Sequence, residues 1–430
     1  MGIRSRSSVI TGMGVINAIA DGIPEFAASL RAGKSGIGFL NHPPEHVPVR
    51  IGAEIKDWKY IEALNSIHGL SDELRQRTKK SSLRSPFPVQ VSVYSALQAW
   101  RMAELETKPA EPERIGLVIA GSNLSQHYIY RQNERFRESP EYLPPSYALH
   151  FMDTDHLGTI SEILNIQGEG FTVGGASASG NIGLIKGAQL VQYGLVDVCL
   201  VVGAVADLSP MEWQGFHAIG AMGGKRFAND PSLSCRPFDR QHEGFIYGQG
   251  SACLVLESSE SAARRGVRSV AEYLGGGIVL DANRLSDPTE KGEAKAMNIA
   301  LQQSGIEPKD IDYISAHGTS SPLGDDTEIM AIRQVFREYT PQIWINSTKS
   351  LTGHCIYAAG MTEAVATVIQ MQEGFVHPNL NLEQPIDDEC RFVGKRSMDT
   401  ELNMAMSNSF GFGGINSSIV LKKGERTEWQ

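Results

Sequence analysis

The stretch Phe171-Thr-Val-Gly-Gly-Ala-Ser-Ala-Ser-Gly-Asn181 carries the strongest structural signal in this chain of 430 residues. A short β-type run passes through a glycine-containing turn into residues 182–193, which are apolar nearly all round and end before Gly194. The pattern predicts a strand, a sharp turn and a buried helix, with Ser177 at the turn. The amino end of a helix favours developing negative charge, so a side chain at this turn is well placed for chemistry.

A similar pattern occurs in the second part of the chain. Residues 358–373 form another apolar helical segment, which follows His354 and ends before Gly374. Apolar β-type runs bounded by glycine occur at residues 9–14, 115–121, 196–205 and 251–257, and helical segments alternate with them. Near-continuous apolar strands between helices indicate an α/β fold with a sheet covered on both faces. The residues alone leave open whether the two patterns come from an internal duplication.

Length and composition indicate a globular protein with two halves. A chain of 430 residues exceeds what one core commonly serves, and we place a division near residue 260, giving parts 1–260 and 261–430. The net charge of −10 argues against a nucleic-acid partner, and no apolar run is long enough to cross a membrane. Five scattered cysteines without a C-x-x-C pair favour reduced thiols in a cytoplasmic protein.

Ser177 and two histidines are the candidate site residues. A serine hydroxyl needs an adjacent base to become a nucleophile, and Ser179 stands where a hydrolase G-x-S-x-G turn needs its second glycine. His317 ends a predicted strand and His354 begins a predicted helix, and a purely structural role stays open for all three residues. Their spacing fits no ordinary metal site. Neutral imidazoles in these places could instead donate hydrogen bonds to a carbonyl oxygen and stabilise an enolate.

Two further segments have an ordinary structural interpretation. The D-x-x-E pattern of Asp325 and Glu328 predicts a helix that begins at Asp325, with Glu328 reaching back to its first turn. We prefer this interpretation to a metal site. The run from Asn408 to Asn416 interleaves phenylalanine with glycine, which is typical of a turn that packs aromatic rings in a core.

Taken together, these segments resemble the β-ketoacyl-carrier-protein synthases, condensing enzymes of the thiolase fold, over residues 9–422. The shared motifs are H-G-T-S-x-P from His317 with Gly324-Asp325, K-S-x-T-G-H from Lys349 to His354, N-S-F-G-F-G-G from Asn408 to Gly414, and Asp239 with Gly244, Gly248 and Gly250. The resemblance implies two similar halves that form a layered αβαβα core.

The resemblance also implies roles for individual residues. His317 and His354 would hold the thioester carbonyl of a malonyl group and promote decarboxylation, while Lys349 orders the site. The backbone amides of Phe412 and of the nucleophile position would form an oxyanion hole, and Phe412 would gate the acyl pocket. The residues that the resemblance places at the substrate or in its support are Phe410, Phe412, Thr319, Ser321 and Glu363.

Two departures from the family pattern concern activity. Ser177 stands where condensing members carry cysteine, and Ser321 stands where many members have threonine. Transacylation onto Ser177 would be slow because a hydroxyl is protonated near pH 7, whereas decarboxylation needs only the imidazoles and the pocket. The chain is therefore similar to the decarboxylating ketosynthases of polyketide β-branching cassettes, which convert malonyl-carrier protein to acetyl-carrier protein.

Two alternatives stay open. One is a condensing enzyme that works through an acyl-serine. The other is a non-catalytic partner subunit of the chain-length type, although that class tends to lose the histidines that this chain keeps.

The resemblance implies an acyl carrier protein as partner, a homodimer with residues 171–174 near the interface, and a downstream enzyme similar to hydroxymethylglutaryl synthase. It implies no metal or diffusible cofactor, because the substrate arrives on the phosphopantetheine arm of the carrier. Carrier proteins are acidic, so an enzyme of net charge −10 needs a local basic patch, and a solvated basic helix face is the alternative interpretation. The candidate docking cations are Arg75, Arg77, Lys79, Lys80, Arg84, Lys225 and Arg226.

Overall fold

The structure is a computed structural model that describes residues 6–284, 286–425 and 429. Its strands are β1 (Ser8–Asn17), β2 (Ala20–Asp21), β3 (Gly38–Phe39), β4 (Ile51–Gly52), β5 (Ile115–Ala120), β6 (Gly170–Val173), β7 (Val198–Gly203), β8 (Gly250–Ser258), β9 (Ala271–Leu280), β10 (Tyr313–Ser315), β11 (Trp344–Asn346), β12 (Phe375–Val376), β13 (Arg391–Phe392), β14 (Met398–Asp399), β15 (Met404–Gly411) and β16 (Ile415–Lys423). Its α-helices are α1 (Ile23–Ala32), α2 (Tyr60–Ser66), α3 (Asp72–Ser82), α4 (Phe87–Met102), α5 (Gln126–Glu138), α6 (Tyr147–His150), α7 (Thr154–Leu164), α8 (Ser179–Gln192), α9 (Pro210–Ala218), α10 (Ser259–Arg265), α11 (Glu290–Ser304), α12 (Pro322–Phe336), α13 (Lys349–Thr352) and α14 (Ala359–Glu373).

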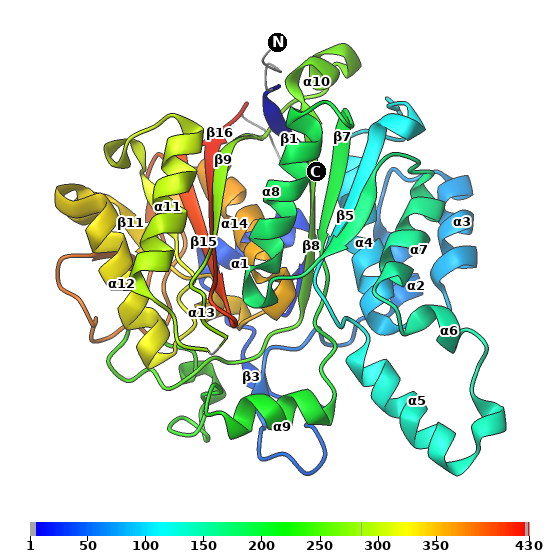
Figure 1. The fold of residues 1–430 in the computed structure, drawn as a ribbon, viewed down its shortest axis with the longest axis horizontal. Coiled ribbons are helices and arrows are strands. Elements are labelled where there is room, and N and C mark those ends of the chain that lie inside the picture. Colours follow the sequence, from blue (N-terminus) through cyan, green and yellow to red (C-terminus); the bar gives the residue numbers. More distant parts are fainter. Residues whose placement is uncertain (1–5, 285, 426–428, 430) are drawn as a thin grey trace.

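One mixed sheet runs through the molecule and is covered by helices on both faces (Figure 1). Its strand order is β13-β11-β10-β15-β16-β9-β1-β8-β7-β5-β6, and β2 pairs with β1. The same five-strand motif occurs twice, as β6-β5-β7-β8-β1 and as β11-β10-β15-β16-β9. If the five strands of each set are numbered in chain order, both sets have the spatial order 3-2-4-5-1. The parallel and antiparallel pairings also match.

The two motifs join where β1 pairs antiparallel with β9. The repeated order supports an internal duplication, and the predicted α/β thiolase architecture is confirmed. The division at residue 260 stays a prediction, and it falls inside α10.

Helices α8 and α14 lie against each other at the centre of the molecule (Figure 1). Both are buried over most of their length, as their apolar sequences predict. They approach closely at Gly180, where an added Cβ would lie 2.5 Å from the backbone nitrogen of Met361. Glycine is needed there because any side chain would force the two backbones apart.

The predicted start of the helix at Asp325 is wrong. Helix α12 begins three residues earlier, at Pro322, whose restricted φ angle suits the first turn of a helix. Asp325 is buried and accepts hydrogen bonds from the backbone N–H groups of Ser320 (3.1 Å) and Phe238 (2.8 Å). The two carboxylates of the D-x-x-E pattern therefore do not cap α12, and they anchor loops that approach it.

Two further expectations concern the cysteines and membrane-spanning segments. All five cysteines are free and buried. Within the described residues, no helix combines the length and apolar character that crossing a membrane requires.

Candidate active site

Two short 3-10 turns bring Ser177 and His354 together. Residues Ala176–Ala178 and Ile356–Ala358 form these turns, which contact each other and lead into α8 and α14. The Oγ atom of Ser177 lies 2.8 Å from Nε2 of His354. Ala176 and Ile356 have matching φ values of 48° and 49°, in a region that a β-branched residue rarely adopts. The internal duplication thus places equivalent strained turns on either side of the same site.

His317 follows β10 and is held from behind by a buried carboxylate. Glu328 accepts hydrogen bonds from the backbone N–H groups of His317 (2.8 Å) and Gly318 (2.7 Å). The ring centroids of His317 and His354 are 5.6 Å apart, in an edge-to-face arrangement. The two imidazoles, which come from different motifs of the fold, therefore lie side by side.

Lys349 connects the second half of the site to His317. Its ammonium group donates to the carbonyl oxygen of His317 (2.6 Å), lies 3.4 Å from Nδ1 of the same residue, and forms a buried ion pair with Glu363. Burial raises the pKa of Glu363, and the neighbouring Lys349 opposes this. Truncating either partner would leave an uncompensated buried charge.

The hydrogen bonds indicate which nitrogen of each imidazole carries the proton. Burial and the nearby Lys349 ammonium lower the pKa of both His317 and His354 well below the ordinary value, so both rings are neutral. Nδ1 of His354 accepts from the backbone N–H of Ile356 (3.2 Å), and Nδ1 of His317 faces Lys349. The proton is therefore assigned to Nε2 in both rings.

This assignment sets the direction of the bond to Ser177. Because Nε2 of His354 carries the proton, it donates to Oγ of Ser177 and does not accept the hydroxyl proton. A neutral imidazole in that state cannot act as a general base toward Ser177.

A cavity of about 400 Å³ opens onto these groups. Seven of the predicted site residues line it: Ser177, Thr319, Ser321, His317, His354, Phe410 and Phe412. Lys349 and Glu363 do not line it. Glu363, which we expected at or in support of the substrate, lies behind Lys349 with 2% of its surface exposed. Within the described chain, no group of three or more His, Cys, Asp or Glu side chains could hold a metal ion.

The phenylalanine-glycine turn packs against the Ser177 turn. A Cβ at Gly411 would lie 2.5 Å from the carbonyl oxygen of Gly175, so glycine allows this close approach. The ring of Phe410 lies 5.6 Å from that of His317, and Phe412 is 39% exposed at the cavity. These positions agree with a buried aromatic wall at Phe410 and an accessible aromatic ring at Phe412.

Sequence reasoning missed several lining residues. They are Phe216, Phe245, Tyr357, Asp281, Glu293 and Asn416. The duplication could have pointed to Tyr357, because it occupies the place in its turn that Ser177 occupies in the other. Phe245 and Asn416 lie within motifs named above, whereas Phe216, Asp281 and Glu293 have no local motif, and only the tertiary fold brings these three to the cavity.

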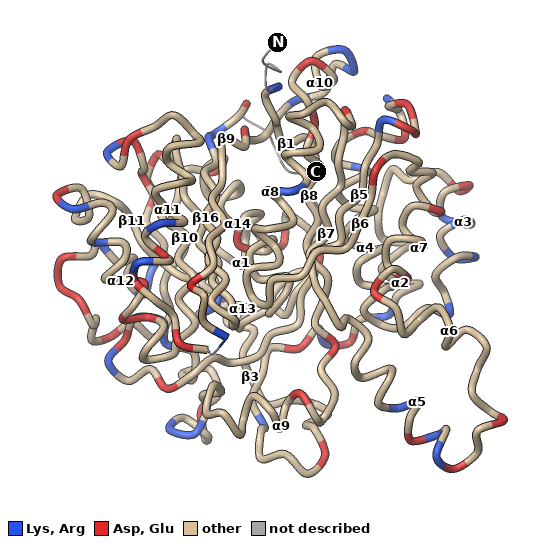
Figure 2. Tube along the Cα trace, viewed as in Figure 1, with Lys and Arg blue, Asp and Glu red and all other residues tan. Residues whose placement is uncertain are grey.

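The predicted docking cations lie in two parts of the chain, on or just after α3 and in the loop after α9. On α3, Arg75 donates to the backbone carbonyls of Leu64 and Ile67, which end helix α2, while Lys80 is exposed. Figure 2 shows the basic residues of α3 at one edge of the molecule. Arg226 is exposed in the loop after α9, a few residues beyond Ala221, which lines the cavity. Arg77 and Lys79 are half-buried.

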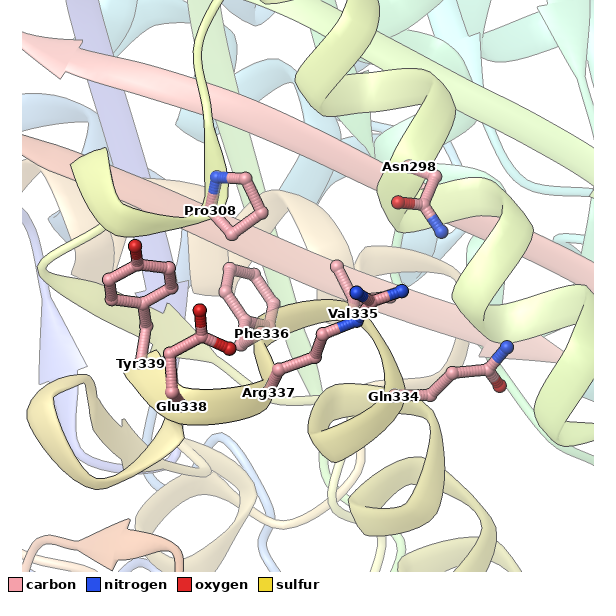
Figure 3. Close-up of a pocket in the computed structure, with 8 residues that line it drawn as sticks. All are labelled: Asn298, Pro308, Gln334, Val335, Phe336, Arg337, Glu338 and Tyr339. Carbon is pink, nitrogen blue, oxygen red and sulfur yellow. The ribbon is translucent and has the colours of Figure 1, made fainter.

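A second hollow of about 350 Å³ lies elsewhere, at the carboxyl end of α12 (Figure 3). Its lining residues are Asn298, Pro308, Gln334, Val335, Phe336, Arg337, Glu338 and Tyr339. None of the predicted site residues belongs to it, so we place the chemistry in the first cavity.

The duplicated motif, with two buried helices that direct their amino ends toward one cavity, defines a protein of the thiolase fold. The N-terminal domain of beta-ketoacyl synthase matches residues 6–262, and the C-terminal domain of beta-ketoacyl synthase matches residues 270–383. The chain belongs to the β-ketoacyl synthase family, as its motifs predicted.

Its relatives include enzymes with different activities. The chain is 38% identical to the polyketide biosynthesis malonyl-ACP decarboxylase PksF of Bacillus subtilis (strain 168), over 97% of each protein. It is 30% identical to 3-oxoacyl-[acyl-carrier-protein] synthase 2 of Coxiella burnetii, over 98% of this chain and 99% of that protein. A solved complex of a type II polyketide synthase acyl-carrier protein with its ketosynthase matches with a TM-score of 0.84 and 25% identity, over 97% of this chain and 100% of that one.

Proposed function

We propose that this protein decarboxylates malonyl-acyl-carrier protein to acetyl-acyl-carrier protein and does not condense acyl chains. The observation that carries the proposal is the hydrogen bond between Ser177 and His354, in which the hydroxyl is the acceptor. Without a base, Ser177 is not activated for acyl transfer. Both imidazoles carry an Nε2 proton for the substrate oxygen, and His354 exchanges its hydrogen bond to Ser177 for one to the substrate. The similarity to a malonyl-ACP decarboxylase supports the same conclusion.

The reaction uses groups that the cavity already presents. The malonyl thioester enters past Phe412, and Nε2–H groups of His317 and His354 donate to its thioester oxygen. The bond between the carboxylate and the α-carbon breaks, carbon dioxide leaves, and the electron pair forms an enolate whose negative charge lies on that oxygen. Preorganised donors of this kind each contribute roughly 3–4 kcal/mol to stabilisation of the developing charge.

Lys349 and Glu363 support the reaction without reaching the substrate. The Lys349 ammonium fixes the carbonyl oxygen and the Nδ1 side of His317, which directs the Nε2 proton into the cavity. Glu363 compensates the ammonium charge in the interior. The same charge disfavours an imidazolium, so it keeps His317 a neutral donor.

The alternatives have less support. An acyl-serine route needs a base at Ser177, and the neighbouring nitrogen is a donor. A non-catalytic subunit would not need two neutral imidazoles beside a buried lysine and an open cavity.

The partners follow from this activity. We infer an acyl carrier protein as the source of substrate, delivered on its phosphopantetheine arm with no metal or diffusible cofactor, in line with the complex of a similar ketosynthase. A hydroxymethylglutaryl-synthase-like enzyme would then use the acetyl group in polyketide β-branching. The free, buried cysteines support a cytoplasmic location.

We also infer a homodimer. Strand β6 lies at one end of the sheet, and Phe171 and Val173 on it are half-buried, so this edge suits pairing with a second copy. Sedimentation of the purified protein would test this, and a monomer at micromolar concentration would contradict it.

Two variants of Ser177 test the proposal. Ser177→Ala should keep primer-independent decarboxylation within a few-fold of wild type, because the hydroxyl only accepts a hydrogen bond. Ser177→Cys should gain an acyl adduct from an acyl-carrier primer. The amino end of a helix lowers the pKa of a thiol toward neutrality, whereas a serine hydroxyl stays protonated there. Intact-protein mass spectrometry reads both results. An acyl adduct on wild-type Ser177 would sink the proposal.

A further inference from the structure

Two carboxyl groups on the wall of the active-site cavity lack a full set of hydrogen-bond partners. Glu293, near the start of α11, is 1% exposed, and its Oε2 atom has no partner among the described residues. Asp281, which follows β9, accepts from the side-chain amide of Asn416 (2.9 Å) through Oδ1, while its Oδ2 atom has no partner in the described chain. Both residues line the same cavity as His317.

The surroundings of Glu293 keep it protonated. Burial, followed by the negative charges of Glu328, Asp281 and Asp325, raises its pKa well above the ordinary value. Helix α11 packs on β9, β16 and α12, and the charged groups that face Glu293 from these elements and from the loop after β9 are those three carboxylates. These surroundings therefore favour the protonated form of Glu293, whose Oε2 atom has no partner among the described residues.

Glu328 cannot take the same part, although burial raises its pKa to about 7. Its two oxygens accept from the N–H groups of His317 and Gly318, and Oε1 also accepts from the side chain of Asn408 at 3.2 Å. These bonds favour the charged form and engage both oxygens, whereas Oε2 of Glu293 has no partner among the described residues.

Decarboxylation creates a need for such an acid. Loss of carbon dioxide leaves an enolate, and the product forms only when its carbon gains a proton. His317 and His354 are neutral rings whose Nε2 protons stabilise the oxygen, and losing one would leave an unfavourable imidazolate. Ser177 accepts a hydrogen bond and is a poor acid. The proton must therefore come from water or from another acid in the cavity.

We propose that Glu293 is this proton source, with Asp281 and Asn416 forming the polar wall along which the proton reaches the reaction centre. The inference rests on the proposed decarboxylation. The carbon–hydrogen bond forms as the O–H bond of Glu293 breaks, and the glutamate left behind regains a proton from solvent. One proton is consumed for each carbon dioxide released, which balances the reaction.

The proposal also bears on the choice between decarboxylation and condensation. A condensing enzyme needs its enolate to survive until it attacks an acyl group. An acid in the cavity shortens that lifetime. Glu293 and Ser177 would therefore favour the same outcome by independent means, one by protonating the enolate and the other by not binding an acyl group.

The test compares Glu293→Gln with Glu290→Gln. Glutamine keeps the shape of Glu293 but has no acidic proton, and Glu290 lies on the same helix without lining this cavity. With malonyl-carrier protein as substrate, we expect kcat of Glu293→Gln to fall by about a hundredfold at unchanged KM, a usual contribution of a general acid. Glu290→Gln should match wild type. In wild type, kcat should fall as the pH rises and Glu293 loses its proton, because burial and the neighbouring carboxylates raise its pKa.

A second readout does not depend on rate. In an equal mixture of H2O and D2O, the deuterium content of the acetyl product reports which group delivers the proton. This ratio should change in Glu293→Gln and stay at the wild-type value in Glu290→Gln. An unchanged kcat together with an unchanged isotope ratio in Glu293→Gln would overturn the inference.

The design separates the two proposals. A wild-type protein that releases no carbon dioxide contradicts the proposed function itself. If wild type is active and Glu293→Gln has the same kcat and the same isotope ratio, only the inference about the proton is contradicted. If Glu293→Gln does not fold, the wild-type isotope ratio measured from pH 6 to 9 takes its place. A ratio that changes as Glu293 loses its proton supports the inference, and a constant ratio overturns it.

Discussion

The hydroxyl of Ser177 lies 2.8 Å from Nε2 of His354, where the resemblance places a thiol in condensing enzymes. The backbone N–H of Ile356 holds Nδ1 of the same ring and thereby sets the proton on Nε2. A single backbone hydrogen bond thus determines that the imidazole donates to Ser177. At this scale, activity depends on the direction of a hydrogen bond as much as on the identity of the residue.

The two imidazoles should each be needed for the rate. His317→Ala and His354→Ala each remove one donor to the thioester oxygen, and we expect kcat to fall by roughly 10²–10³-fold with a smaller change in KM. His42→Ala, at an exposed histidine, serves as the control. Release of carbon dioxide from malonyl-carrier protein measures the effect. A loss of less than threefold in both variants would argue that other donors hold the oxygen.

A buried histidine away from the site should make stability depend on pH. Burial lowers the pKa of His156 to about 3, while in the unfolded chain it titrates near 6.5. Between these values the unfolded state binds a proton that the folded state does not, so this residue's contribution to stability is lost as the pH falls below about 6.5.

We therefore expect His156→Gln to become more stable relative to wild type by about 1.4 kcal/mol for each pH unit below 6. Urea unfolding at pH 7, 6 and 5 measures this difference. A constant difference between the two proteins across that range would contradict the assignment.

Much of the site could be predicted at the scale of single residues, because catalytic histidines, the lysine and the phenylalanine-glycine turn lie in short contiguous motifs. Glu293 could not be predicted, since no local pattern distinguishes it from a surface glutamate on α11. Its burial depends on β9, β16 and α12 packing around it. Asp325 and Glu328 were misinterpreted for a related reason: their spacing matches a helix cap, and only tertiary contacts with Phe238 and His317 show their actual role.

At the scale of elements, helices α8 and α14 were predictable because their apolar character is continuous and glycine ends each of them. Their contact with each other was not, since it depends on Gly180 and Gly360, which leave space for the neighbouring backbone. The contact holds the Ser177 and His354 turns in register, so helix packing and site geometry are linked.

This link predicts the effect of a single methyl group. In Gly180→Ala the new Cβ meets backbone atoms of Gly360 and Met361, which cannot rotate away, so we expect a loss of about 1–3 kcal/mol in the free energy of unfolding. Gly158→Ala, in the middle of α7 with open space around it, should instead gain about 0.5–1 kcal/mol. Urea denaturation compares the two. Equal stability of both variants would mean that the helices do not pack as described.

At the scale of the whole molecule, the duplicated strand order explains why residues from two distant motifs meet in one cavity. The sequence suggested the repeat through two helices, but the matching strand orders emerge only in three dimensions. Surface charge was the least predictable property, because spacing along α3 did not show that Arg75 is engaged by the carbonyls of Leu64 and Ile67.

Carrier docking should therefore be tested on cations other than Arg75. We expect Lys79→Glu with Lys80→Glu, and separately Arg226→Glu, to raise KM for malonyl-carrier protein severalfold without changing kcat, because they weaken attraction to an acidic partner. The effect should shrink at high salt. Lys295→Glu, an exposed lysine on α11, is the control. An unchanged KM in the double lysine variant would exclude α3 as the docking surface, and an unchanged KM in Arg226→Glu would exclude the loop after α9.

The most direct measurement is the intact mass of malonyl-carrier protein after incubation with the enzyme, with and without an acyl-carrier primer. We expect loss of one carbon dioxide from the carrier at the same rate in both cases, with no mass added to the enzyme. A β-ketoacyl product that requires the primer would contradict it.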